Sequence, residues 1–249
     1  MQTLNFGHRG ASAYAPENTL AAFNLAFDLG ADGVELDVSL TQDGVPVVIH
    51  DDRVDRTTDG RGAVKDMTLA EIQRLDAGAK FDAKFRGERV PTLAEVLSTV
   101  GKRGIVNIEL KSGKLADVGL ETAAIARVIE ESGAADRVII SSFNHFALHR
   151  MHDLDARLPI GFLYFNRVPI SLPYVETRPL ARPTALHPRF VVVTPGFVKW
   201  ARGKNYQINT WTVDEPEEMR RLIALGVDSI MTNKPDVLRQ VLAGGASAV

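Results

Sequence analysis

Hydrophobic and polar positions recur with two different periods along this chain. Short runs with alternating apolar residues are typical of strands, and longer segments with apolar residues three and four apart are typical of amphipathic helices. Eight strands are predicted, the first ending within residues 6–10 and the others at 33–40, 105–110, 138–141, 160–164, 185–187, 208–213 and 228–232. Helical patterns lie between most of them, at 20–29, 93–100, 115–131, 146–154, after 195 and at 216–225. Repeated strand–helix units of this number predict an α/β fold, the TIM (β/α)8 barrel.

One apolar segment does not fit the regular alternation. Gln42-Asp43-Gly44 is typical of a hairpin turn, and residues 45–50 return from it. A tight turn cannot join parallel strands, so we expect this arm to run antiparallel to the second strand and to bring His50 towards it. Residues 51–90 are polar, with a short helical pattern introduced by Thr68, and we interpret them as an insertion at the barrel mouth.

Length and composition limit the class of protein. A chain of 249 residues, 45% hydrophobic and 24% charged, has the size of one TIM barrel, although two small domains would also fit. We expect residues 1–249 to form a single barrel domain. The net charge of −2 argues against a nucleic-acid-binding protein, and the lack of cysteine excludes disulfides and thiolate chemistry.

Targeting segments are not evident in the sequence. The chain begins without a basic, apolar leader, and no apolar run approaches the ~20 residues of a membrane span. We therefore expect a cytoplasmic protein without stable membrane association, acting on a small molecule. The sequence leaves the oligomeric state open.

Acidic residues stand two apart in the second strand, where Glu35 and Asp37 share one face. Ion pairs with Arg or Lys would satisfy an isolated pair of this kind. Glu109, however, ends the third predicted strand, and the carboxyl ends of barrel strands meet at one mouth. Three carboxylates there predict an all-oxygen site for one divalent cation, Mg²⁺ or Ca²⁺, rather than zinc.

Basic and aromatic residues are expected at the same mouth. Arg9 and Lys111 beside a metal suit an anionic substrate, above all a phosphate. His8, at the end of the first strand, and His50, at the end of the arm, suggest paired proton transfer. Trp211 could either pack or form an apolar wall for the substrate.

Several motifs together resemble one enzyme family, the metal-dependent glycerophosphodiester phosphodiesterases. They are Phe6-Gly7-His8-Arg9-Gly10, Pro16-Glu17-Asn18-Thr19, Val34-Glu35-Leu36-Asp37-Val38, Asp43-Gly44, His50-Asp51, Asp55-Arg56-Thr57-Thr58-Asp59-Gly60, Val90-Pro91-Thr92-Leu93, Asn107-Ile108-Glu109-Leu110-Lys111, Trp211-Thr212-Val213 and Thr232-Asn233-Lys234-Pro235. The resemblance runs along the whole chain. No nucleotide-binding Gly-rich fingerprint is present.

This resemblance implies hydrolysis of a glycerophosphodiester to sn-glycerol 3-phosphate and an alcohol. It implies metal ligation by Glu35, Asp37 and Glu109, acid–base catalysis by His8 and His50, and phosphate contacts from Arg9 and Lys111. Related phospholipases suggest attack by a substrate hydroxyl, which gives a cyclic phosphate, in preference to direct attack by water. The sequence does not assign the acid and the base to particular histidines.

Other residues allow more than one interpretation. His187 ends the sixth strand, where the family more often carries Asn, and a substrate contact there is as plausible as none. Glu17 and Asn18 are expected to hold the first loop and cap its helix, whereas His145, His149 and His152 are expected on an outer helix face. Two other functions stay open: a lysophospholipase D acting on lipids, and a non-catalytic barrel that binds phosphodiesters.

Overall fold

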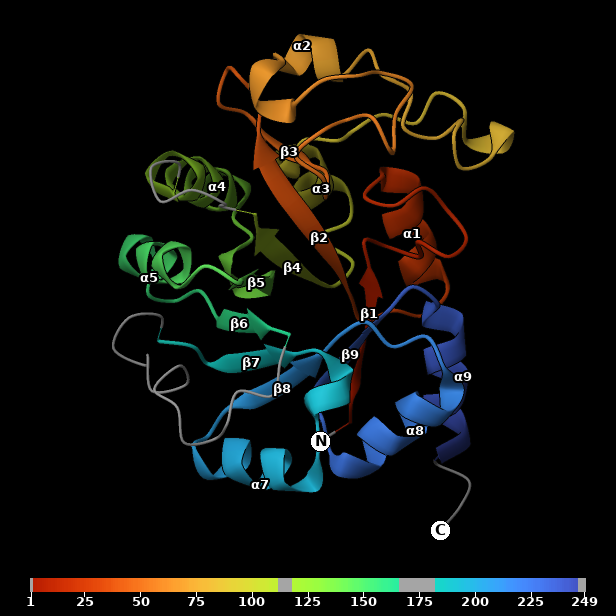
Figure 1. Ribbon diagram of the computed structural model, residues 1–249, viewed down its shortest axis with the longest axis vertical. Coiled ribbons are helices and arrows are strands. Elements are labelled where there is room, and N and C mark those ends of the chain that lie inside the picture. Colours follow the sequence, from red (N-terminus) through yellow and green to blue (C-terminus); the bar gives the residue numbers. More distant parts are fainter. Residues whose placement is uncertain (1, 112–117, 166–181, 246–249) are drawn as a thin grey trace.

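A closed parallel barrel forms the body of the protein in the computed structural model, which describes residues 2–111, 118–165 and 182–245 (Figure 1). Its strands are β1 (Leu4–His8), β2 (Gly33–Leu40), β4 (Ile105–Leu110), β5 (Val138–Ser142), β6 (Ile160–Tyr164), β7 (Ala185–Pro188), β8 (Gln207–Thr210) and β9 (Ser229–Thr232). Neighbouring strands pair in parallel in this order, and β1 pairs with both β2 and β9. That double pairing closes the barrel and confirms the predicted TIM fold.

The arm after the second strand is also confirmed. Strand β3 (Pro46–Val48) pairs antiparallel with the end of β2 and lies outside the closed ring. Its connection turns at Gly44, whose φ of 77° is a left-handed conformation that glycine adopts without strain. The return therefore places His50 beside the mouth, as the hairpin pattern predicts.

Helices surround the barrel between its strands. They are α1 (Leu20–Asp28), α3 (Leu93–Thr99), α4 (Val118–Ser132), α5 (His145–Leu154), α7 (Pro195–Gly203), α8 (Pro216–Leu225) and α9 (Pro235–Gly245). The sequence patterns predict all of them except α9. Most of the Pro-containing segment 166–183, and the start of the helix expected at 115–131, lie outside the described residues.

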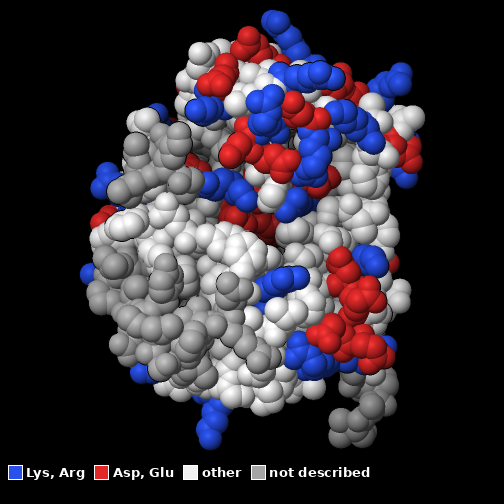
Figure 2. Space-filling view, viewed as in Figure 1, with Lys and Arg blue, Asp and Glu red and all other residues white. Residues whose placement is uncertain are grey.

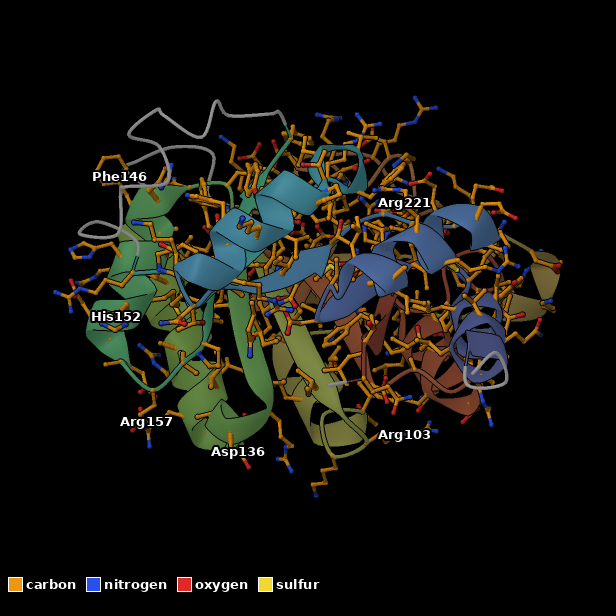
Figure 3. The ribbon with its side chains drawn as sticks, turned by 90° about the horizontal axis from the view of Figure 1, so that it is seen from below. Arg103, Asp136, Phe146, His152, Arg157 and Arg221 are labelled. Carbon is orange, nitrogen blue, oxygen red and sulfur yellow. The ribbon has the colours of Figure 1, made fainter. Side chains whose placement is uncertain are left out.

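Alternation along the strands separates the core from the mouth. In β2, Val34, Leu36 and Val38 are fully buried in the hydrophobic core formed with the surrounding helices. Glu35 and Asp37 lie between them in sequence and therefore face the opposite way, into the barrel. Figure 3 shows Phe146 at one end of the barrel, and Arg103, Asp136 and Arg157 at the other.

Residues 51–90 have a small apolar core of their own. Ile49, Val54, Val64, Ile72 and Val90 belong to this second buried cluster, which also contains Val47 of β3. The short helix α2 (Leu69–Ile72) begins at Thr68, which forms a capping box with Glu71. The insertion is thus anchored to the β3 arm by burial of apolar side chains (Figure 1).

Candidate active site

Strand register brings the acidic residues together. In the parallel ladder between β1 and β2, His8 lies opposite Glu35. In the ladder between β2 and β4, Asp37 lies opposite Glu109. Residues paired in register have side chains on the same side of a sheet, so three adjacent strands direct one histidine and three carboxylates into the same mouth.

The three carboxylates form a compact, shielded cluster. One oxygen each from Glu35, Asp37 and Glu109 lies within 4.8 Å of the other two. Glu35 is 3% exposed and Asp37 1% exposed. Burial and the negative charge of Asp37 raise the pKa of Glu109 to about 7, and burial with the charges of Asp37 and Glu109 raises the pKa of Glu35 well above its usual value. The cluster therefore favours a cation or bound protons.

Two cationic side chains approach these acids. The Arg9 backbone N–H donates to Glu35 Oε2 at 3.0 Å, and Arg9 Nε lies 3.4 Å from Asp37 Oδ2. Lys111 Nζ lies 3.1 Å from Glu109 Oε1 and 3.5 Å from Asp37 Oδ1. Arg9 has a φ of 55°, an uncommon conformation for a residue other than glycine. Two cations leave three carboxylates with one unbalanced negative charge, which suits a further positive ligand.

His8 is held from behind by an amide. Its Nδ1 lies 2.8 Å from Asn233 Oδ1, while Asn233 Nδ2 donates to Asp214 Oδ2 at 2.6 Å. That second bond fixes the amide orientation, so Oδ1 is the acceptor and His8 Nδ1 carries the proton. Nε2 is then left free, 3.9 Å from Glu35 Oε2. Burial and the nearby charge of Arg9 lower the pKa of His8, which favours the neutral ring.

His50 is held by a carboxylate. Its Nδ1 lies 2.6 Å from Asp51 Oδ1, and its side chain is 32% exposed. A carboxylate can only accept here, so Nδ1 donates to Asp51 and the ring orientation is fixed with Nε2 on the opposite side. The two histidines therefore have different partners, a neutral amide for His8 and an anion for His50.

Comparison with known proteins places the chain in a family. A family model described as the glycerophosphoryl diester phosphodiesterase family matches residues 8–237. The chain belongs to this family. A glycerophosphodiester phosphodiesterase of Caldanaerobacter subterraneus subsp. tengcongensis is 46% identical over 249 aligned residues, which cover 98% of this chain and 100% of that protein.

Solved structures agree with this family assignment. An Oleispira antarctica phosphodiesterase, solved in complex with the product sn-glycerol-3-phosphate, has a TM-score of 0.91 and 30% identity, with 97% of each chain covered. A glycerophosphodiester phosphodiesterase from Agrobacterium tumefaciens has a TM-score of 0.82 and 31% identity, covering 96% of this chain and 99% of that one. The resemblance to the family inferred from the motifs is thus confirmed.

The acidic cluster fits the divalent cation that the sequence predicts. Its donors are all carboxylate oxygens, the ligands that Mg²⁺ and Ca²⁺ prefer. A separation within 4.8 Å can be bridged by one ion with Ca²⁺–O distances of about 2.3–2.6 Å. Asn18 Nδ2 donates to Asp37 Oδ2 at 2.9 Å, which orients that carboxylate. Among the described residues, these three acids are the group with metal-binding geometry.

Aromatic side chains occupy another part of the mouth. Phe143 follows β5, Phe165 follows β6 and Trp211 follows β8. The Phe143 and Phe165 rings are stacked with centroids 4.4 Å apart, and the Trp211 ring meets their edges at 5.8 and 5.3 Å. Trp211 Nε1 donates to the His187 carbonyl oxygen at 2.7 Å, which fixes the indole. We call these three residues the aromatic cluster.

His187 lies deeper than the sequence suggests. Its side chain is fully buried inside the barrel, and its Nε2 lies 2.9 Å from Asn209 Nδ2. Gly161 on the neighbouring strand provides the space, because a Cβ there would lie 2.3 Å from His187 Nε2. Burial lowers the pKa of His187 to about 3, so the ring is neutral. Substrate contact by His187 stays a prediction, and it would require this packing to open.

Several supporting residues have roles that the sequence motifs do not reveal. Asn233 lies within a motif that assigns it no role, Asp214 lies just outside the motifs, and Asn18 was expected only to hold the first loop and cap its helix. Asn233 and Asp214 hold His8, and Asn18 orients Asp37. The expectation that Glu17 or Asn18 caps the first helix is wrong, since the N-cap of α1 is Thr19. These contacts join residues far apart in sequence, and periodicity along one strand cannot reveal them.

The outer histidines have separate partners. The His145 ring is tilted by 33° against the Phe162 ring, with centroids 4.3 Å apart. His149 Nε2 lies 3.5 Å from Asp153 Oδ2, and His152 Nε2 lies 3.2 Å from Arg182 Nη1. Figure 3 shows His152 on α5 at the outside of the molecule. Among the described residues, no helix is long and apolar enough to cross a membrane.

Proposed function

We propose that this site hydrolyses glycerophosphodiesters to sn-glycerol 3-phosphate and an alcohol. The observation that carries the proposal is the convergence of Glu35, Asp37 and Glu109 with His8 at one mouth, in a chain of the glycerophosphoryl diester phosphodiesterase family. The sn-glycerol-3-phosphate bound to the Oleispira antarctica phosphodiesterase supports the same product class.

In this proposal the three carboxylates hold one divalent cation, Mg²⁺ or Ca²⁺. When bound, the ion polarises the phosphoryl oxygens and offsets the negative charge that develops in the transition state. Arg9 and Lys111 now lie against these carboxylates. With a cation bound between the acids, Arg9 and Lys111 would be free to bind the phosphodiester oxygens, and Arg9 could contact two oxygens at once.

His8 acts as the general base in this scheme. The hydrogen bond to Asn233 assigns the ring proton to Nδ1, so Nε2 presents a lone pair to the mouth. Burial lowers the pKa of His8, which keeps the ring neutral and able to accept a proton. Nε2 would remove the proton of the nucleophile, either the glycerol 2-hydroxyl or a water molecule.

His50 acts as the general acid. The Asp51 carboxylate accepts from Nδ1 at 2.6 Å and so orients the ring, and a proton on Nε2 would pass to the departing alkoxide. Unequal partners thus give the two histidines opposite roles. We favour attack by the glycerol 2-hydroxyl, since the related phospholipases that the sequence resembles react through a cyclic phosphate. This first step would release the alcohol and leave a cyclic 1,2-phosphate. A water molecule would then open the ring to glycerol 3-phosphate, with His50 taking the proton of the water and His8 returning its proton to the 2-oxygen.

Product analysis tests the reaction. Glycerophosphocholine and glycerophosphoethanolamine are incubated with the enzyme and either Mg²⁺ or Ca²⁺, and phosphorus species are followed by ³¹P NMR. We expect glycerol 3-phosphate in a metal-dependent reaction, with a transient cyclic 1,2-phosphate. Absence of the cyclic species during rapid turnover would contradict the 2-hydroxyl route, and absence of any turnover by folded, metal-loaded protein would contradict the proposed function.

A second candidate substrate is a lysophospholipid. Three large apolar side chains are exposed near the ends of neighbouring strands. Leu120, in the first turn of α4 after β4, is 72% exposed. Phe146, in the first turn of α5 after β5, and Phe165, directly after β6, are each 54% exposed. Helices of a TIM barrel begin at the catalytic end, so these apolar side chains rim the mouth. A higher kcat/KM for lysophosphatidylcholine than for glycerophosphocholine would favour this candidate.

Three further expectations from the sequence complete the proposal. We propose that residues 1–249 form one domain, with 51–90 as its insertion, because the insertion core includes Val47 of the barrel arm. We expect the protein to act without nucleic acid or stable membrane association. A cytoplasmic location stays a prediction from the sequence.

A further inference from the structure

Arg56, from the insertion, connects two parts of the barrel mouth. Its Nη1 and Nη2 donate to Glu17 Oε2 and Oε1 at 2.8 and 2.7 Å. Its Nε and Nη2 donate to Asp51 Oδ2 and Oδ1 at 2.7 and 3.1 Å. One guanidinium therefore binds two carboxylates through a pair of hydrogen bonds each. Figure 2 shows charged side chains gathered over the insertion and around the mouth below it.

Both carboxylates also bind residues of the proposed catalytic machinery. Asp51 Oδ1 lies 2.6 Å from His50 Nδ1. Glu17 Oε1 accepts a hydrogen bond from Arg9 Nη1 at 2.9 Å. Arg56 is thus the centre of a continuous chain of hydrogen bonds that runs from His50 to Arg9. The chain runs through side chains alone, from Asp51 through Arg56 to Glu17.

The geometry differs from that of an ordinary surface ion pair. Exposed pairs contribute little to stability, because one flexible contact is screened by water. Arg56 is 48% exposed, but paired hydrogen bonds to two carboxylates restrict its guanidinium plane. The hydrogen bonds from Arg56 lower the pKa of Asp51 well below its usual range, which keeps that carboxylate an acceptor for His50.

We propose that Arg56 is a positioning residue that sets the orientations of His50 and Arg9 together, so that the insertion 51–90 takes part in building the active site. This inference rests on the proposed function. Asp51 is 31% exposed and borne on the segment that follows β3, so without Arg56 its carboxylate can rotate into solvent. The His50 ring would then lose the contact that directs Nε2 towards the substrate.

Arg56→Ala is the variant that tests this inference, and Arg53→Ala is its matched control. Arg53 lies three residues away in the same segment, is 59% exposed and pairs with Asp55. With glycerophosphocholine we expect Arg56→Ala to lower kcat about 10- to 100-fold, within the range of a misplaced general acid. Arg53→Ala should stay within about twofold of the wild-type rate, like most surface substitutions.

Four readouts separate positioning from general damage. A glycerophosphodiester with an aryl leaving group needs little protonation, so the Arg56→Ala defect should shrink with it. Added guanidinium ion should restore part of the lost kcat. Arg56→Lys should recover less than guanidinium-rescued Arg56→Ala, since an ammonium cannot form two paired contacts. Metal affinity should stay within about twofold of wild type, because Arg56 makes none of the contacts to Glu35, Asp37 or Glu109.

Two kinetic results would overturn the role of Arg56. One is a wild-type kcat in Arg56→Ala; the other is an equal loss for alkyl and aryl leaving groups without guanidinium rescue. The ring nitrogen NMR signals of His50 give a test that needs no turnover. A shifted His50 Nδ1–H signal in Arg56→Ala would support the positioning role, and an unshifted signal would refute it. This result does not depend on the proposed function, which fails if the wild-type enzyme itself releases no glycerol 3-phosphate.

Discussion

The barrel mouth has two chemically different sides. On the acidic side, β1, β2 and β4 carry His8, Glu35, Asp37 and Glu109, and Arg9 and Lys111 directly follow β1 and β4. On the aromatic side, β5, β6 and β8 lead into Phe143, Phe165 and Trp211. The buried carboxylates of the acidic side are costly in free energy unless a positive charge lies beside them. The rings of the aromatic side are instead stabilised when they are shielded from water. We infer that the first performs phosphate chemistry and the second accommodates the leaving alcohol.

The largest effect should follow from changing the acidic side. Glu35→Gln and Glu109→Gln keep the side-chain size but each remove a proposed metal ligand. We expect kcat/KM to fall about 10³-fold or more, since metal stabilisation is worth several kcal/mol. Steady-state assays at saturating metal check this, with Glu130→Gln on the exposed surface of α4 as the control. Near-normal turnover in either variant would show that the acidic cluster is not needed for catalysis.

The histidines should show the next largest effect. His8→Ala and His50→Ala are each expected to lower kcat by about 10²- to 10⁴-fold. Because we assign the general acid to His50, its loss should matter less for an aryl leaving group, whereas the His8→Ala defect should persist. Equal responses to the leaving group would contradict the assignment. His149→Ala, on the outer helix α5, serves as the control.

Protonation of the acidic cluster predicts a pH dependence. The pKa of Glu109 rises from 4.5 to about 7 in the folded protein, so the metal-free fold binds a proton that the unfolded chain has lost. The stability from this proton is complete below about pH 4.5 and is lost as pH rises through about 7, a change of about 3 kcal/mol. Added metal should therefore raise the melting temperature more at pH 8 than at pH 5.5.

The Glu109→Gln variant isolates this contribution. It cannot titrate at residue 109, so the melting temperature of its metal-free form should depend less on pH between 5.5 and 8. Differential scanning calorimetry of the wild type and this variant, with chelator and with metal, provides the comparison. Identical pH profiles for the two metal-free proteins would show that Glu109 is not the group that titrates there.

The smallest effect should come from the aromatic side. Trp211→Ala removes a partly buried ring that meets Phe143 and Phe165, and we expect KM to rise about 5- to 50-fold with a smaller change in kcat. Trp211→Phe should recover most of the affinity. Michaelis–Menten kinetics with substrates of different head groups measure this. A large fall in kcat at unchanged KM would show that Trp211 contributes to the phosphate chemistry and not to binding of the leaving alcohol.

Much of the acidic side was predictable because it depends on strand periodicity. Glu35 and Asp37 stand two apart, and Glu109 and Lys111 do likewise, so alternation alone directs each pair to one face. The barrel topology then brings those faces together at the strand ends. The resemblance to the family drew on these same residues, which explains why motif and structure agree there.

Contacts between distant segments were not predictable in this way. Asn233 lies 225 residues from His8, and Arg56 lies 39 residues from Glu17. Their hydrogen bonds depend on barrel closure and on how the insertion folds. The depth of His187 likewise follows from the space at Gly161 on the adjacent strand. Helix α9 was missed although Pro235 is typical of a first helical position and Leu238 is buried.

Measurement of bound metal and activity in one titration tests the central claim most directly. Metal-stripped enzyme receives Mg²⁺ or Ca²⁺ in substoichiometric steps, and bound ion and glycerol 3-phosphate release from glycerophosphocholine are measured at each step. The account predicts that activity rises in proportion to bound ion up to one equivalent, and that Glu109→Gln loses both. Full activity in the presence of chelator, or one tightly bound ion without any effect on turnover, would contradict it.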